Sequence, residues 1–175
     1  RLRCEGLDTL ATVRINGQVV GTADNMFRTW EFDVKPALVA GENTIEVRFA
    51  SVLPYIRERN AVRRLPNWGG PKEVPGRAWV RKEPCNFGWD WGPVVVTAGI
   101  WRAIGLVAFS ARLNDVAIRQ EHSAGAVTLK VAADAQGAAA AVRTRVLFDG
   151  VAVAEGTAEL LAGRAEMLVA IPDPQ

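Results

Sequence analysis

Long apolar runs are missing from this 175-residue sequence, and so is a strong excess of charge of either sign. The longest hydrophobic stretches, such as residues 94–96 and 151–154, are far shorter than the roughly 20 apolar residues that a membrane-spanning helix needs. The formal net charge of +2 is too small for the strongly basic face that nucleic-acid binders present. We therefore expect neither a membrane nor a nucleic acid among the partners.

Cysteine and histidine are scarce, with two cysteines and one histidine in the whole sequence. Cys4 and Cys85 lie far apart and form no disulfide framework, and together with His122 they do not make a metal site. Because free cysteines are usually buried, we expect two free, mostly buried thiols, although the sequence leaves their pairing open. No cofactor is expected.

A start signal is also absent, because the sequence begins Arg1-Leu2-Arg3 without an initiator methionine or a hydrophobic signal segment. Its last residues, 171–175, do not complete a further predicted strand or helix. We interpret the sequence as a piece of a longer protein.

The first 50 residues show the alternation of apolar and polar residues that is typical of half-buried antiparallel strands. Alternating runs on both sides of Asn16-Gly17 predict a hairpin with a type I′ turn, in which both turn residues take positive φ. Further strands are predicted at residues 29–33 and 44–49.

The alternation stops between about residues 50 and 99, and a structureless loop of this length is uncommon in a compact domain. Residues 54–64 could form a short helix with proline in its first turn. The rest of this insert is rich in glycine, proline and tryptophan, and a strand is predicted from Ile100 to about Phe109.

Beyond Ser110 the composition shifts to short strands rich in alanine and valine, separated by turns such as Asp149-Gly150 and Ala162-Gly163. This spacing is typical of a small immunoglobulin-like β-sandwich. We predict two all-β domains, residues 1–109 and 110–175, with strands in the second at 115–119, 126–132, 142–148, 152–157 and 166–171.

One short stretch, Trp89-Asp90-Trp91, carries chemistry that suits a sugar. A pyranose has an apolar face of C–H groups and a rim of hydroxyls, so its site pairs an aromatic plane with a carboxylate that accepts hydrogen bonds from two hydroxyls. A carboxylate between two tryptophans is costly to desolvate unless it has partners or lies at an open pocket. We therefore predict a substrate-binding role for Asp90, Trp89 and Trp91.

The conformation of this stretch is left open by the sequence. Gly88 and Gly92 permit backbone turns that other residues avoid, and Pro93 stiffens the exit. If the backbone were extended instead, the two tryptophans would share one face and Asp90 would point away from them.

Structural alternatives apply to the other residues of the insert. Trp68, Trp79 and Trp101 could form the insert's own small core, with their N–H groups bonded to the backbone. Three basic residues, Arg77, Arg81 and Lys82, could pair with Asp90 or Glu83, or could form a solvated face.

Several stretches in fixed order resemble the β-mannosidases of glycoside hydrolase family 2. They are residues 5–17 (EGLDTLATVRING), Asp24-Asn25-Met26-Phe27-Arg28, Gly41-Glu42-Asn43-Thr44, Val80-Arg81-Lys82, residues 87–93 (FGWDWGP) and Gly99-Ile100-Trp101-Arg102. The resemblance extends from about residue 5 to residue 109 and is weak beyond, and FGWDWGP is its most specific part.

The resemblance implies a large exo-acting enzyme with a sugar-binding jelly roll, an immunoglobulin-like domain and a (β/α)₈ barrel that carries two catalytic glutamates. In a retaining mechanism these carboxyl groups lie about 5 Å apart. The present sequence has no alternating βαβ region and no Asn-Glu dipeptide, which contains the acid/base residue in that family. No catalytic residue is therefore expected in it.

On this resemblance we expect a non-catalytic central fragment of such an enzyme, with an N-terminally incomplete jelly roll. Its loop at Trp89–Trp91 would contact a terminal mannose, so the expected partners are mannosides and the catalytic barrel of the parent chain. Three alternatives stay open: a freestanding carbohydrate-binding module, a purely structural pair of β-sandwiches, and a fragment of an exo-glucosaminidase or β-galactosidase. A periplasmic or secreted location is favoured over the cytoplasm.

Overall fold

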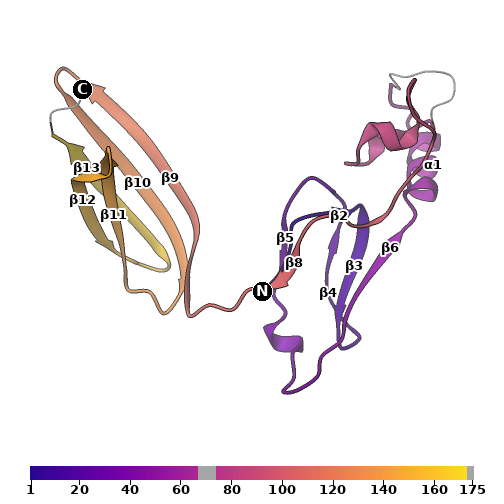
Figure 1. Cartoon of the computed structure of the whole chain (residues 1–175), viewed down its shortest axis with the longest axis horizontal. Helices are drawn as coiled ribbons and strands as arrows, with labels where there is room; N and C mark the ends of the chain where they lie inside the picture. Colours follow the sequence, from indigo (N-terminus) through magenta and orange to yellow (C-terminus); the bar gives the residue numbers. More distant parts are fainter. Residues whose placement is uncertain (67–73, 173–175) are drawn as a thin grey trace. The chain divides into compact units, whose positions relative to one another are not determined.

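The protein is described by a computed structural model that covers residues 1–66 and 74–172 (Figure 1). The chain divides into two compact units, Arg1–Val107 and Ala108–Gln175. Across the described ranges, strands dominate, accompanied by one α-helix and three short 3₁₀ helices. The prediction of an all-β chain is confirmed.

Within its described residues, the first unit contains three antiparallel sheets. Their orders are β5-β1-β8, β4-β3-β6 and β2-β7. The strands are β1 (Leu2–Cys4), β2 (Leu7–Asp8), β3 (Leu10–Ile15), β4 (Gln18–Ala23), β5 (Trp30–Phe32), β6 (Ile45–Ala50), β7 (Gly99–Ile100) and β8 (Ile104–Leu106). A 3₁₀ helix, η1 (Lys35–Ala37), follows β5.

The core of this unit is built by alternation along the strands. In β3 every second residue is buried, and Leu2 and Cys4 of β1 are buried on either side of the exposed Arg3. Residues of both three-stranded sheets enter one cluster, since Leu2 and Phe32 join Val13 and Ile15 there. The two sheets therefore form a sandwich around a shared hydrophobic core.

The predicted hairpin is confirmed by the pairing of β3 with β4. Asn16 and Gly17 both have positive φ, at 51° and 81°, as a type I′ turn requires. The Asn16 side chain donates to the Ala37 carbonyl at 2.9 Å, so the turn is also tied to η1.

The insert between β6 and β7 begins with the helix α1 (Val52–Val62). Ser51 caps it by accepting a hydrogen bond from the Leu53 N–H at 3.3 Å. The predicted helix is confirmed, but it begins and ends two residues earlier than residues 54–64, because the cap fixes its start ahead of Pro54.

Two 3₁₀ helices, η2 (Arg77–Trp79) and η3 (Pro84–Phe87), follow α1 in the insert. A second core joins them to the helix, with Val52 and Ile56 of α1 packed with Val80 and Phe87. The insert thus has its own small hydrophobic core.

As far as residue 172, the second unit contains one three-stranded sheet, β13-β10-β9, and one two-stranded sheet, β11-β12. The strands are β9 (Ala111–Ser123), β10 (Ala126–Gly137), β11 (Ala141–Phe148), β12 (Val151–Glu159) and β13 (Arg164–Ile171). Each predicted strand is present and longer than predicted. The predicted turns are confirmed as well, with positive φ at Asp149-Gly150 and at Ala162-Gly163.

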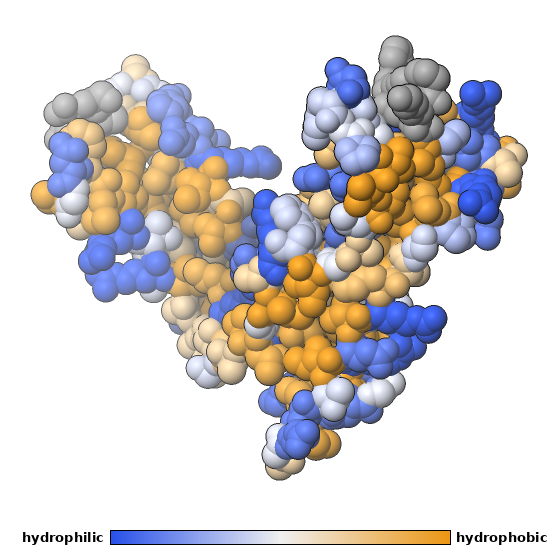
Figure 2. Space-filling view, turned by 45° about the vertical axis from the view of Figure 1, so that its right-hand side comes forward, coloured by the Kyte–Doolittle hydropathy of each residue, from blue (hydrophilic) through white to orange (hydrophobic). Residues whose placement is uncertain are grey.

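Much of the apolar surface of the second unit is exposed, as the fainter, left-hand part of Figure 2 shows on its visible face. Its buried hydrophobic residues are small, namely Val131, Ala133, Ala135, Ala165 and Val169, whereas larger ones such as Ile118, Phe148 and Leu168 are exposed. In the parts of the chain that the structure describes, no helix is long and apolar enough to cross a membrane.

Candidate functional site

The segment that carries the predicted sugar contacts leaves the insert's core through Phe87. This side chain is completely buried, and it ends the helix η3. Gly88 follows with φ 107°, a conformation that residues with a Cβ rarely adopt, and its N–H donates to the Cys85 carbonyl at 3.2 Å. The chain therefore turns sharply away from the core at this glycine.

Trp89 and Gly92 close a tight turn rather than a strand. The Gly92 N–H donates to the Trp89 carbonyl and the Trp89 N–H to the Gly92 carbonyl, both at 3.4 Å. The Trp89 and Trp91 side chains are 45% and 75% exposed, and Asp90 between them is exposed too. The question that the sequence left open is thus answered in favour of a turn with its side chains at the surface.

Gly92 does not have the role that the sequence suggested for it. Its φ is not positive, and a Cβ added there would meet no atom within 4 Å. Gly88 alone of the two glycines has a backbone that requires glycine.

Arg77 lies against the turn, with its guanidinium over the Trp89 ring, 5.5 Å from the ring centroid. It also donates to the Pro84 carbonyl at 3.3 Å. Within residues 1–66 and 74–172, no hydrogen bond or ion pair involves the Asp90 carboxylate, so neither Arg77 nor Arg81 is its partner there. Asp90 is therefore available to hydroxyl donors.

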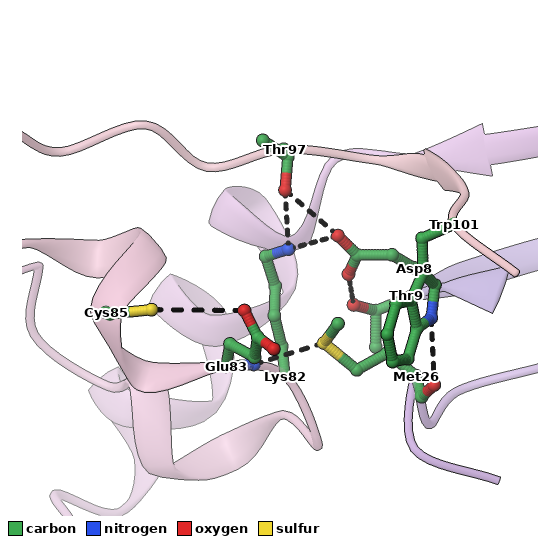
Figure 3. Close-up of polar contacts among 8 residues, drawn as sticks. All are labelled: Asp8, Thr9, Met26, Lys82, Glu83, Cys85, Thr97 and Trp101. Carbon is green, nitrogen blue, oxygen red and sulfur yellow. Dashed lines mark hydrogen bonds and ion pairs between the residues drawn. The ribbon is translucent and has the colours of Figure 1, made fainter. Parts of the chain in front are cut away.

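Lys82 contradicts both predictions made for it. It belongs to no solvated face and pairs with neither Asp90 nor Glu83; instead its ammonium forms an ion pair with Asp8 (Figure 3). The two side chains are 0% and 5% exposed. A charge can be buried so completely only when it is paired, and here the partner comes from 74 residues earlier in the chain.

Two hydroxyl groups complete this cluster. The Thr97 hydroxyl lies 3.1 Å from Asp8 Oδ2 and 3.2 Å from Lys82 Nζ, and the Thr9 hydroxyl donates to Asp8 Oδ1. Sequence reasoning missed the cluster because a pair so distant in the chain has no local signal. One clue was available: Val80 and Lys82 alternate with the exposed Arg81, which places them on the same, buried side.

Trp79 has the structural role that was considered for it, since it packs against the insert's core, whereas Trp101 is 40% exposed and is not part of that core. Both indoles donate to backbone carbonyls. The Trp79 indole donates to the Arg63 carbonyl at 3.2 Å, and the Trp101 indole donates to the Met26 carbonyl at 3.1 Å. Trp68 lies outside the described residues.

The two cysteines are free thiols. Cys4 is buried in the core of the first unit, and this burial raises the pKa of its thiol. Cys85 is partly buried, with its Sγ 3.9 Å from Glu83 Oε2. Among the residues that the structure describes, no group of three or more His, Cys, Asp or Glu side chains could hold a metal ion.

The sequence profile of a known family, described as the galactose-binding domain-like domain of glycosyl hydrolase 2, matches residues 1–102. This chain belongs to that family. The match includes β1 to β7 of the first unit, the Asp8–Lys82 pair and the exposed turn at Trp89–Trp91, and it ends before β8.

Curated relatives are similar over a wider range. The chain is 38% identical over 138 residues to β-mannosidase B of Emericella nidulans, covering 76% of this chain and 16% of that protein. It is 37% identical over 169 residues to β-mannosidase B of Thermothelomyces thermophilus, covering 94% of this chain and 20% of that protein. The chain therefore spans about a sixth to a fifth of the length of these relatives.

A solved structure resembles both units. The crystal structure of β-D-mannosidase from Dictyoglomus thermophilum matches 99% of this chain and 22% of its own, with a TM-score of 0.76 and 31% sequence identity. The resemblance to the β-mannosidases of glycoside hydrolase family 2 inferred from the sequence is confirmed by these matches.

Proposed function

We propose that this chain is a non-catalytic, sugar-contacting segment of a retaining exo-β-mannosidase. Residues 1–109 would form its galactose-binding-like jelly roll, and residues 110–175 its immunoglobulin-like domain. The catalytic glutamates would lie in a barrel elsewhere in the parent chain. The observation that carries the proposal is the exposed turn Trp89-Asp90-Trp91, anchored on a buried core in a chain of this family.

The chemistry of the turn supports this role. Asp90 is exposed and, in the described parts of the chain, has no protein partner, so its two oxygens can accept hydrogen bonds from two adjacent hydroxyls of a sugar. Trp89 offers an aromatic plane beside it, and the guanidinium of Arg77 over that plane restrains the ring. Trp91 is more exposed than Trp89 and would close the pocket from the other side.

The barrel of the parent enzyme would supply the rest of the site. One carboxylic acid would protonate the leaving oxygen and a second carboxylate would attack the anomeric carbon, with the two groups about 5 Å apart. The turn would act before and during this step, because hydrogen bonds to Asp90 that strengthen as the sugar ring distorts lower the barrier.

The test uses the parent enzyme and the 175-residue chain side by side. The full-length enzyme, assayed on a panel of aryl glycosides, should prefer the β-mannoside over the β-galactoside, β-glucosaminide and β-glucuronide. The chain alone should show no turnover above a contaminant control. A preference for another glycoside would reject the assigned sugar, and turnover by the chain alone would reject its non-catalytic role.

Calorimetry separates this proposal from a freestanding carbohydrate-binding module. A module should bind mannose or manno-oligosaccharides by itself, whereas half of a shared site should bind them weakly or not at all. Tight binding by the 175-residue chain would therefore favour the module.

A further inference from the structure

The loop from Lys82 to Thr97 carries the turn on an outgoing and a returning arm. The two ends of this loop bind the same carboxylate, that of Asp8. Lys82 stands at the start of the outgoing arm and Thr97 at the end of the returning arm, 15 residues apart in sequence. Lys82 Nζ and the Thr97 hydroxyl both bind Asp8 Oδ2, and they lie 3.2 Å from each other (Figure 3). Trp89–Trp91 lie between these two attachment points, and the completely buried Phe87 holds the same loop farther out.

Asp8 is a firm point of attachment. It lies in β2, which pairs with β7 through Leu7 with Ile100 and Asp8 with Gly99. Leu7 is completely buried in the core of the sandwich. The Thr9 hydroxyl holds the other carboxylate oxygen, so the side chain has no freedom to follow a moving loop.

Further contacts hold the start of the outgoing arm against the sandwich near Asp8. The Met26 N–H donates to the Arg81 carbonyl at 3.0 Å, and the Glu83 N–H lies 3.1 Å from the Met26 sulfur. On the returning side, the Trp101 N–H donates to the Gly6 carbonyl at 3.2 Å. Both arms are thus tied to the sandwich close to Asp8.

Farther out, the two arms have few bonds to each other. The Val95 N–H donates to the Asn86 carbonyl at 3.1 Å and so links the arms, and Gly88 N–H donates within η3. The turn beyond these bonds is exposed. Besides the base, only the buried Phe87 and the half-buried Val96 among the described residues pack the two arms against the insert's core, so a shift at the base would still be felt at Asp90.

We propose that Asp8, Lys82 and Thr97 form a loop-base clamp that positions the turn Trp89-Asp90-Trp91. They are positioning residues, since none of them would touch the sugar. The consequence for catalysis rests on the proposed function, whereas the mechanical role of the clamp does not.

Thr97→Val in the full-length enzyme tests the clamp without stranding a buried charge, because the Asp8 carboxylate keeps its bonds to Lys82 and Thr9. Amide hydrogen exchange should quicken about three- to tenfold at Gly88 and Val95, as expected for one lost hydrogen bond. It should not change in the hairpin of β3 and β4. The kcat/KM on an aryl β-mannoside should fall by a similar factor, and Thr97→Ser should restore both values.

Two further variants sharpen the test. Asp8→Asn keeps the shape of the side chain but removes the counter-charge of the buried Lys82, so it should quicken loop exchange more than Thr97→Val does and also lower the stability of the first unit. Thr22→Val is the matched control, because Thr22 is exposed on β4 of the same unit, and it should leave exchange and kcat/KM unchanged.

The outcomes separate the clamp from the proposed function. Unchanged loop exchange in both Thr97→Val and Asp8→Asn would overturn the clamp, and so would equal acceleration of the loop and the hairpin in Thr97→Val, which leaves the buried ion pair in place. Faster loop exchange with an unchanged kcat/KM would support the clamp and reject the sugar contact assigned to the turn.

Discussion

Two aspartates of this chain lie in opposite environments. Asp8 is buried and satisfied by a lysine and two threonines, whereas Asp90 is exposed on a turn, and the described part of the structure gives it no partner. A buried carboxylate without partners would be costly, and an exposed one costs nothing to leave open. Removal of Asp8 or its partner should therefore affect folding, and removal of Asp90 should affect ligand contacts.

Lys82→Met should lower the free energy of unfolding of the first unit by about 3–5 kcal/mol, because it strands the buried Asp8 carboxylate. Lys130→Met is the matched control, since Lys130 pairs with Glu121 on the surface with both side chains about half exposed. The control should cost less than about 1 kcal/mol. Urea titration followed by tryptophan fluorescence measures the first variant, and circular dichroism measures the second. Equal, small losses in both would contradict the structural role of the buried pair.

At the scale of elements, short sequence patterns predicted those turns and strands whose conformation depends on neighbouring residues. Asn16-Gly17 specified its own turn, and alternation specified β3, β6 and the strands of the second unit. The insert was harder, because its helix start depended on the Ser51 cap and the turn at Trp89 on the buried Phe87. The partner of Lys82 could not be predicted, since it is set by the packing of segments far apart in sequence.

At the scale of elements, position 21 of β4 also requires glycine, which the sequence alone did not indicate. A Cβ built on it would lie 2.3 Å from the Phe32 ring, inside the core of the sandwich. Gly21→Ala should therefore destabilise the first unit by about 1–3 kcal/mol through overpacking.

The control for this prediction is Gly105 on β8, where an added Cβ meets no atom within 4 Å and φ is not positive. Gly105→Ala should be neutral, or stabilising by up to about 1 kcal/mol, since it restricts the unfolded chain. Urea unfolding curves of the two variants give the comparison. A Gly21→Ala variant as stable as Gly105→Ala would show that the close approach of β4 to Phe32 is wrong.

At the scale of the whole molecule, the two units differ in the size of their buried side chains. The first buries Leu2, Leu7, Ile15 and Phe32, whereas the second buries valines and alanines. Burial of a large aliphatic or aromatic side chain stabilises by roughly 1.5–3 kcal/mol, and an alanine methyl contributes much less. The second unit should be the less stable of the two.

Urea unfolding can test this difference because all six tryptophans lie at or before position 101 and report only on the first unit. Circular dichroism follows the strands of both units. The transition seen by circular dichroism should begin at lower urea than the one seen by fluorescence. Coincident transitions would mean that the units unfold together and that the smaller buried side chains of the second unit do not lower its stability relative to the first.

The proposed function depends on the turn at Asp90, and one pair of measurements on Asp90→Ala in the full-length enzyme tests it most directly. Loss of one or two charge-assisted hydrogen bonds, each worth roughly 1.5–3 kcal/mol, should lower kcat/KM on an aryl β-mannoside by about ten- to several-thousand-fold. The melting temperature should stay within about 2 °C of the parent value, because the exposed carboxylate stabilises nothing in the described structure. A melting temperature lowered by many degrees, with near-normal kcat/KM in the folded enzyme, would contradict the sugar contact assigned to Asp90 and make it a structural residue.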